Sequence, residues 1–169
     1  AQVLETIGLP CILKQPDSSF SQGVVKVDTG EQFKDEMSKL LQKSDLVIAQ
    51  EFMPTDFDWR IGIFDRKLLY ACKYFMARKH WQILKRNADG RQLEGGAETF
   101  PVEDVPLAIC QTALKAANLI GNGFYGVDLK QVGNKVYVIE VNDNPSVDAG
   151  VEDLVLKDRL YRQVMEIMM

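Results

Sequence analysis

The sequence predicts an α+β fold built largely from antiparallel sheets. Apolar, β-branched runs are joined by short turn signals, as at residues 59–64 and 67–74 about Asp65-Arg66, which is typical of β-hairpins. Amphipathic helical patterns occur between groups of such runs instead of after every strand. This order favours mixed hairpins and helices over a doubly wound parallel sheet.

Each element can be assigned in turn from its periodicity and its flanking turn residues. In the first part the predicted elements are a helix end at 3–7 closed by Gly8, strands at 11–15 and 24–27, a helix from Thr29 to about Lys43, and a strand at 46–52. In the second part they are a hairpin at 59–64 and 67–74, a polar and basic loop at 77–98, a helix at about 105–120, a hairpin at 124–142, and a helix from about Val151. The loop at 77–98, with its glycines, is the best candidate for a mobile segment.

The composition is that of an ordinary globular protein of 169 residues, with 46% hydrophobic and 26% charged residues. A net charge of −4 gives no electrostatic reason to expect nucleic acid or an anionic membrane as a partner. Cys11, Cys72 and Cys110 are odd in number and widely spaced, which favours reduced, buried residues and a cytoplasmic location. The chain begins at Ala1 without Met, and we expect it to be part of a longer protein.

The hairpin at 124–142 carries the strongest functional signal. With a three-residue loop at Gly133-Asn134-Lys135, Val132 pairs with Val136, Lys130 with Val138, and Asp128 with Glu140. Because side chains alternate between faces, this register directs one set into a core: Val127, Leu129, Tyr137, Ile139 and Val141. A two-residue loop would place Asp128 and Glu140 on opposite faces.

Three oxygen-bearing side chains then share the other face of this hairpin: Asp128, Glu140 and Asn142. Directly opposed Cβ atoms lie roughly 5 Å apart, so two carboxylates can share a cation. Mg²⁺ typically takes one or two carboxylates together with water and substrate phosphates. The sequence therefore predicts a magnesium site, with Mn²⁺ as an alternative ion. The competing interpretation is an ordinary solvated polar face.

Four pieces in this order resemble the ATP-grasp superfamily, and within it the RimK-like carboxylate–amine ligases related to glutathione synthetase. The pieces are Pro10-Cys-Ile-Leu-Lys14, a Ser/Gly loop ending in Gly23-Val24, Ile48-Ala-Gln-Glu-Phe52, and Asp128 with Glu140-Val-Asn142. The resemblance implies two α+β lobes with nucleotide bound between them, at 1–52 (incomplete at its start) and 53–169. It also implies an N-terminal domain elsewhere in the same protein.

The resemblance assigns roles residue by residue. The residues it implies for ATP are Lys14, Ser18, Ser19 and Gly23 at the phosphates, Gln50, Glu51 and Phe52 at the adenine, and Asp58 at the ribose. Arg60 and Lys73, on adjacent strands, are the candidate catalytic residues that meet the γ-phosphate or the substrate carboxylate. The loop at 18–23 carries less glycine than the family pattern. Gln82 and Leu84 stand where that pattern has Arg and Asn.

Each of these residues also has a purely structural interpretation. These interpretations are a strand-end lysine for Lys14, an ordinary loop at 18–23, a plain strand end at 50–52, a turn residue for Asp58, and exposed basic residues for Arg60 and Lys73. The resemblance implies an ADP-forming ligase that joins a carboxylate to an amine, an amino acid or peptide, through an acyl phosphate. The rival functions are an ATP-grasp kinase and a non-catalytic nucleotide-binding module.

Overall fold

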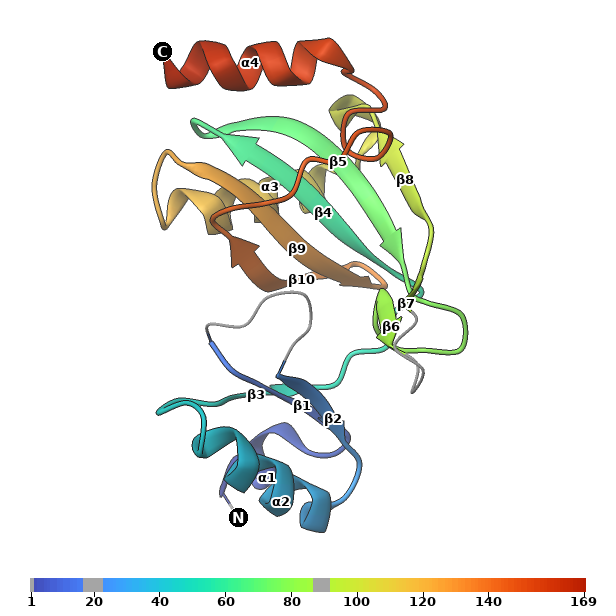
Figure 1. Cartoon of the computed structure of the whole chain (residues 1–169), viewed down its shortest axis with the longest axis vertical. Coiled ribbons are helices and arrows are strands. Elements are labelled where there is room, and N and C mark those ends of the chain that lie inside the picture. Colours follow the sequence, from blue (N-terminus) through green and yellow to red (C-terminus); the bar gives the residue numbers. More distant parts are fainter. Residues whose placement is uncertain (1, 17–22, 87–91) are drawn as a thin grey trace. The chain divides into compact units, whose positions relative to one another are not determined.

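The structure is a computed structural model that describes residues 2–16, 23–86 and 92–169. The chain divides into two compact units, Ala1–Pro54 and Thr55–Met169, which are drawn with their elements labelled in Figure 1. The boundary predicted from the sequence lies after residue 52. Each unit is described by itself.

The first unit is a three-stranded antiparallel sheet covered by two helices. Its elements are α1 (Gln2–Ile7), β1 (Cys11–Lys14), β2 (Val24–Val27), α2 (Gly30–Leu41) and β3 (Ile48–Glu51), with β1 in the centre of the sheet. The core contains Cys11, Leu13, Val27, Phe33 and Leu40. These elements agree with the predicted ones to within a few residues.

Helix α2 begins at a capping box formed by Thr29 and Gln32. The Thr29 hydroxyl accepts a hydrogen bond from the Gln32 N–H at 3.2 Å, and the Gln32 side chain accepts one from the Thr29 N–H, also at 3.2 Å. Two backbone N–H groups that a helix start leaves unpaired are satisfied by this capping box. Phe33 and Leu40 are buried on the inner face of the helix.

The second unit is built on a five-stranded antiparallel sheet in the order β10-β9-β4-β5-β8. Its elements are β4 (Phe57–Phe64), β5 (Lys67–Phe75), β6 (Leu84–Arg86), β7 (Gln92–Glu94), β8 (Ala97–Phe100), the 3₁₀ turn η1 (Val102–Asp104), α3 (Leu107–Asn118), β9 (Phe124–Val132), β10 (Lys135–Asn142) and α4 (Asp158–Met168). Strands β4 and β5 form the predicted hairpin. Asp65 and Arg66 take φ of 46° and 62° in its turn, as a two-residue type I′ turn requires.

The two faces of this sheet are covered by different elements. Helix α3 lies across one face (Figure 1), where the main core lies, with Trp59, Ile61, Val127 and Leu129 from the strands and Ile109, Ala113 and Ala117 from the helix. On the opposite face, Leu160 of α4 is fully buried with Phe64, Leu69, Tyr70 and Cys72. The Arg60–Asp128 and Lys130–Asp58 ion pairs considered below lie on this second face, beside that smaller core.

Two sequence predictions need correction here. The segment 77–98, predicted as a loop, contains the β6–β7 hairpin and the first residues of β8, which pairs with β5. The last helix begins at Asp158 instead of about Val151, because residues 151–157 form turns.

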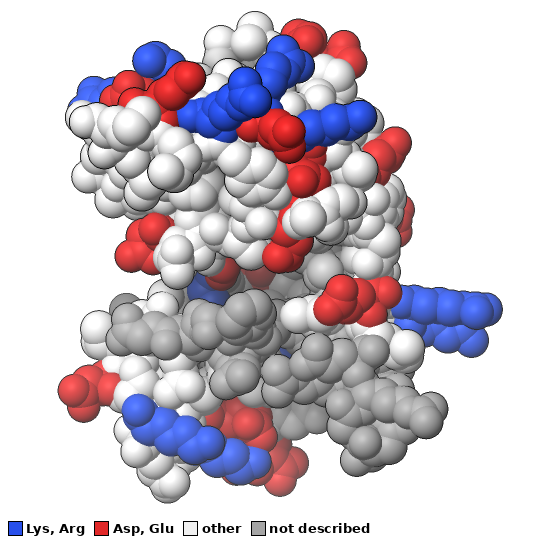
Figure 2. All heavy atoms as spheres, turned by 45° about the horizontal axis from the view of Figure 1, so that its top comes forward, with Lys and Arg blue, Asp and Glu red and all other residues white. Residues whose placement is uncertain are grey.

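The three cysteines are free thiols and all are buried, as predicted. Within the described ranges, no helix combines the length and the apolar character needed to cross a membrane. Figure 2 shows acidic and basic side chains intermixed around the C-terminal segment, in keeping with the small net charge of −4.

Candidate functional site

The β9–β10 hairpin brings Asp128 and Glu140 opposite each other, but by a different route from the predicted one. The turn has two residues, so Lys135 pairs with Val132 and Val136 pairs with Gln131. The register then shifts between Val138 and Glu140. Ile139 is the extra residue of a β-bulge, in which two residues on one strand face one on the other. The predicted three-residue loop is wrong, and the predicted Asp128–Glu140 pair is present.

The bulge also explains which side chains of β10 reach the core. Val136 and Val141 pack against the core below α3, whereas Tyr137 is 37% exposed. The prediction that Tyr137 points into the core is therefore wrong. Before the bulge the alternation runs one residue out of phase with the predicted one, and after the bulge it returns to the predicted phase.

Asp128 is held by Arg60 from the neighbouring strand β4, where the two residues are direct partners in the ladder. The guanidinium Nε and Nη2 each donate to one carboxylate oxygen of Asp128, both at 2.7 Å. Only 19% of the Arg60 side chain and 15% of the Asp128 side chain remain exposed. Burial alone would lower the pKa of Arg60, but the hydrogen bonds and charge of Asp128 raise it instead, so this guanidinium keeps its charge.

A second ion pair lies one step along the same face. The Lys130 ammonium of β9 contacts Asp58 of β4 and the Thr55 hydroxyl, each at 2.6 Å. The Thr55 hydroxyl also donates to Asp58 at 3.0 Å. Burial raises the pKa of Asp58, and the attraction of Lys130 does not fully offset that rise. The residue predicted to meet the ribose is thus engaged by two neighbours within its own unit.

The two candidate catalytic residues do not face each other. In the β4–β5 ladder Arg60 pairs with Cys72 and Lys73 pairs with Trp59, so the two basic side chains project from opposite faces of the sheet. The Lys73 ammonium lies 4.6–4.8 Å from the ring centroids of Phe57, Trp59 and Phe100. Arg60 lies with the carboxylates, and Lys73 lies in a cage of aromatic rings on the α3 side.

The oxygen donors predicted for magnesium can be assessed from this geometry. The Asn142 amide nitrogen lies 3.4 Å from Asp128 Oδ2 and 3.3 Å from the Gly126 carbonyl oxygen, on the same side of the hairpin as Glu140, which is exposed. Across the described part of the chain, no three His, Cys, Asp or Glu residues are grouped as a metal cluster. Two carboxylates and one amide still suit Mg²⁺, which keeps waters and phosphates as its other ligands. Arg60 occupies both oxygens of Asp128 and would compete with the ion.

The predicted phosphate residues lie around the end of β1 in the first unit. Lys14 ends β1 between Val24 of β2 and Ile48 of β3, and its side chain is half-buried. Gly23 has φ of 72°, and a Cβ there would come within 2.5 Å of the Gln15 side-chain oxygen. A residue other than glycine is therefore strained at this position. Ser18 and Ser19 lie outside the described residues.

The predicted adenine residues follow one another on β3 and just beyond it. Gln50 pairs with Ile12 and Glu51 with Cys11. The Phe52 N–H donates to the Pro10 carbonyl at 3.2 Å, so the strand continues its contact with the preceding chain. The Lys26 ammonium lies 4.7 Å from the centroid of the Phe52 ring. A base stacked on this ring has to use its other face or displace the lysine.

Sequence reasoning missed three residues of the charged face: Lys130, Tyr74 and Glu152. The spacing of two residues between Asp58 and Arg60, and again between Asp128 and Lys130, was a usable signal, because it places opposite charges on one face of each strand. Tyr74 and Glu152 gave no comparable signal, since their contact joins residues 78 positions apart.

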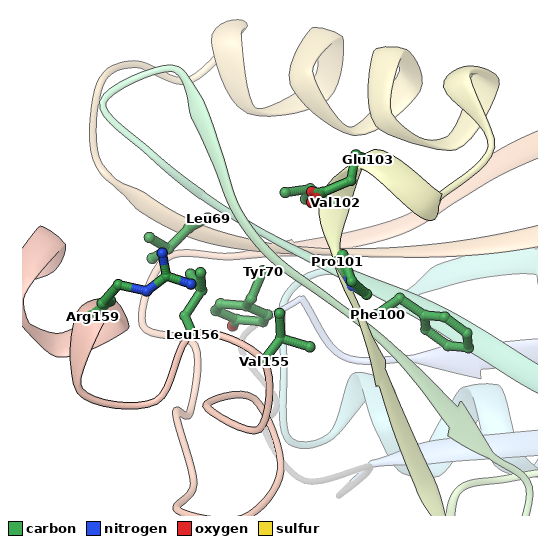
Figure 3. A pocket seen from close by; sticks show the side chains of 9 residues that line it. All are labelled: Leu69, Tyr70, Phe100, Pro101, Val102, Glu103, Val155, Leu156 and Arg159. Carbon is green, nitrogen blue, oxygen red and sulfur yellow. The ribbon is translucent and has the colours of Figure 1, made fainter.

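A small cavity of about 120 Å³ lies between β5, the segment after β8 and the start of α4 (Figure 3). Its lining is mainly apolar, with Glu103 and Arg159 contributing charge. None of the predicted site residues lines it. The candidate site of the second unit is therefore the charged sheet face and not this cavity.

No protein-family model matches the chain. Among curated proteins, it is 28% identical over 150 residues to a formate-dependent phosphoribosylglycinamide formyltransferase of Syntrophotalea carbinolica, and 28% identical over 163 residues to a protein of that name from Vibrio cholerae. These matches cover 85% and 94% of this chain but 36% and 40% of the relatives. The chain thus spans about two fifths of the length of the curated relatives it matches.

Two solved structures resemble it along almost its whole length. D-alanine–D-alanine ligase from Bacillus anthracis superposes with a TM-score of 0.66 at 16% identity, covering 98% of this chain and 56% of that one. The ATP-grasp ligase PsnB, complexed with a phosphomimetic variant of its minimal precursor, Mg and ADP, gives a TM-score of 0.64 at 18% identity, covering 99% and 48%. The chain has the fold of part of the ATP-grasp ligases. The predicted α+β class with antiparallel sheets is confirmed.

Proposed function

We propose that this chain is the ATP-grasp part of an ADP-forming ligase that joins a carboxylate to an amine. The shared fold supports this proposal, and so do the relatives, one of which is named for its dependence on formate and two of which are named as ligases. The observation that carries it is the Asp128–Glu140 pair, with Asn142 beside it and Arg60 bound to it on one sheet face.

In the proposed reaction a carboxylate oxygen of the acid forms a bond to the γ-phosphorus of ATP. The bond between that phosphorus and the β–γ bridging oxygen breaks, and ADP leaves. The amine nitrogen then attacks the acyl carbon, phosphate departs with the acyl oxygen, and the amine gives up a proton to water. Catalysis of this kind rests on positioning and charge neutralisation, and needs no nucleophilic side chain from the protein.

Asp128, Glu140 and Asn142 would hold Mg²⁺, whose contribution when bound is to neutralise charge on the phosphate oxygens. Arg60 keeps its charge although it is largely buried, and it already binds a carboxylate with two parallel hydrogen bonds. The same geometry suits a substrate carboxylate or a phosphoryl group. We therefore assign Arg60 to the anionic reacting groups, and Asp128 to the metal once Arg60 has exchanged partners.

The remaining assignments within this proposal follow the sequence resemblance. Lys14, Gly23 and the loop between them would hold the phosphates, residues 50–52 the adenine, and Asp58 the ribose. Lys73, caged by aromatic rings on the other face, supports the sheet in this proposal instead of contacting substrate. The finer assignment to RimK-like enzymes, with an amino acid or peptide as the amine, rests on the four sequence pieces alone.

The test is a coupled ADP-release assay of the full-length protein against pools of carboxylic acids, amino acids and peptides. Glu140→Ala should abolish Mg²⁺-dependent ADP formation and leave the circular dichroism spectrum unchanged. Glu166→Gln, an exposed carboxylate on α4, is the matched control and should keep wild-type turnover. Undiminished turnover in purified Glu140→Ala would remove the metal assignment.

Product analysis separates the rival functions. A ligase consumes acid and amine together and releases one phosphate for each amide formed. A phosphorylated product that accumulates without amine would indicate a kinase. Tight nucleotide binding with no turnover in any pool would indicate a binding module.

A further inference from the structure

Glu152 is the one fully buried charged residue in the part of the chain that the structure describes, with 0% of its surface exposed. It lies ten residues beyond the end of β10, in the segment that leads to α4. Burying a carboxylate is costly unless its oxygens are hydrogen-bonded. The partners of Glu152 therefore indicate what this carboxylate does in the fold.

Both of its oxygens are satisfied. The Tyr74 hydroxyl of β5 donates to Oε1, and the Asp148 N–H donates to Oε2 at 2.8 Å. Burial raises the pKa of the Tyr74 phenol, and the bond to Glu152 raises it further, so this hydroxyl is a donor at neutral pH. The carboxylate ties the segment after β10 to a side chain near the end of β5.

Tyr74 connects this carboxylate to the candidate site. The Arg60 guanidinium carbon lies 5.3 Å from the centroid of the Tyr74 ring, within the range of a cation–π contact. Arg60 in turn binds Asp128 through two hydrogen bonds of 2.7 Å. Contacts thus run without interruption from Glu152 through Tyr74 and Arg60 to Asp128.

We propose that Glu152 is a positioning residue for Arg60, acting through the hydroxyl of Tyr74. With its hydroxyl bonded to a buried carboxylate, the Tyr74 side chain is held from swinging away from Arg60, and its ring face supports the guanidinium. Arg60 is then held in one orientation, from which it can pass from Asp128 to an anionic reacting group. The catalytic consequence rests on the proposed function, whereas the effect of Glu152 on Arg60 does not.

The fold supplies a matched control for this idea. The Thr99 hydroxyl of β8 donates to the Val151 carbonyl at 2.6 Å and so pins the same segment to the sheet. This bond does not involve Tyr74 or Arg60. Thr99→Val therefore loosens the segment around Glu152 while it leaves the contacts of Arg60 in place.

The experiment is an NMR measurement of arginine side-chain ¹⁵N signals in the full-length protein, with Arg60 assigned by its loss in Arg60→Met. In the wild type, rotation of the Arg60 guanidinium should be slow, so that its two Nη atoms give separate ¹⁵N signals. Tyr74→Phe, which removes one oxygen, and Glu152→Gln, which keeps the volume, should both shift and average these signals. Thr99→Val should leave them at wild-type positions even where it lowers the melting temperature as much.

Two results would overturn the proposal: unchanged Arg60 signals in Tyr74→Phe, or an equal change in Thr99→Val. Tyr74→Phe decides the matter if Glu152→Gln does not fold. In the ADP-release assay, displacement of a positioned group lowers kcat by roughly tenfold to a hundredfold. We expect that loss in Tyr74→Phe, with the KM for ATP unchanged. If the wild type turns over no substrate, the proposed function fails while the NMR result still decides the role of Glu152.

Discussion

Replacing Arg60 with Met should make the stability of the protein depend on magnesium. In the wild type the guanidinium satisfies both oxygens of Asp128, so an added cation has to compete with an internal one. Met fills much of the space of the arginine stem and carries no charge. The carboxylate of Asp128 is then left without its partner on a sheet face that also carries Glu140 and Asn142.

The magnitude follows from the burial of the pair. Removing one partner of a fully buried ion pair costs about 3–5 kcal/mol, and exposed pairs contribute at most about 1 kcal/mol. With 19% and 15% of the two side chains exposed, the free energy of unfolding should fall by about 2–3 kcal/mol. An ion at tenfold excess over its Kd returns about 1.4 kcal/mol of that loss.

The assay is urea unfolding of wild type and Arg60→Met with and without MgCl₂, at constant ionic strength. Lys130→Met is the matched control, because it leaves Asp58 without its ion-pair partner. The two side chains are similarly buried, with 13% of Lys130 and 15% of Asp58 exposed, but Asp58 lies opposite Tyr74 of β5 and not opposite a second carboxylate. Arg60→Met should regain stability with Mg²⁺, and Lys130→Met and Arg60→Met/Asp128→Asn should not. Equal recovery in Arg60→Met and Lys130→Met would mean that Mg²⁺ merely screens a lone carboxylate, and the proposed metal site would be refuted.

Two further predictions concern the fold. Thr29→Ala removes the hydroxyl that accepts a hydrogen bond from the Gln32 N–H at the start of α2. Urea unfolding should show a loss of about 1 kcal/mol in the free energy of unfolding. Thr6→Ala is the control, and an equal loss in that variant would contradict the role of the cap. Burial raises the pKa of Cys72 from 9.0 to about 11, so the unfolded state loses this proton at a lower pH than the folded state. Stability should therefore fall as the pH rises from about 9 to 11, as the raised pKa of Tyr74 also requires, and a flat urea midpoint over that range would exclude this linkage.

The sequence predicted best those features whose signals are local. The start of a helix at Thr29, the Asp65-Arg66 turn and the buried cysteines each depend on a few neighbouring residues, and the structure agrees with all three. The Asp128–Glu140 pair was also found, although the two deviations behind it, a shorter turn and a bulge, were not. The shorter turn and the bulge shift the register by one residue in opposite directions. The Asp128–Glu140 pair was therefore predicted correctly although the predicted loop length was wrong.

What the sequence did not reveal depends on contacts between distant segments. Arg60 and Asp128 are 68 positions apart, and nothing in their surroundings indicates that each is the other's partner. Lys73 looks equivalent to Arg60 in the sequence, and only the β4–β5 register places it on the opposite face. The contact of Tyr74 with Glu152 spans 78 positions, and a single glutamate in a turn segment gives no sign that it is buried.

The bulge at Ile139 has a consequence for comparing this hairpin with others. Because Ile139 is the extra residue of the bulge, a hairpin one residue shorter at this point would keep the same two carboxylates opposite each other on regular strands. The length of β10 can therefore change by one residue without separating Asp128 from Glu140. A sequence alignment of this hairpin with one that lacks the bulge therefore needs a gap of one residue at Ile139. Without that gap, Glu140 is aligned one position away from the glutamate that corresponds to it.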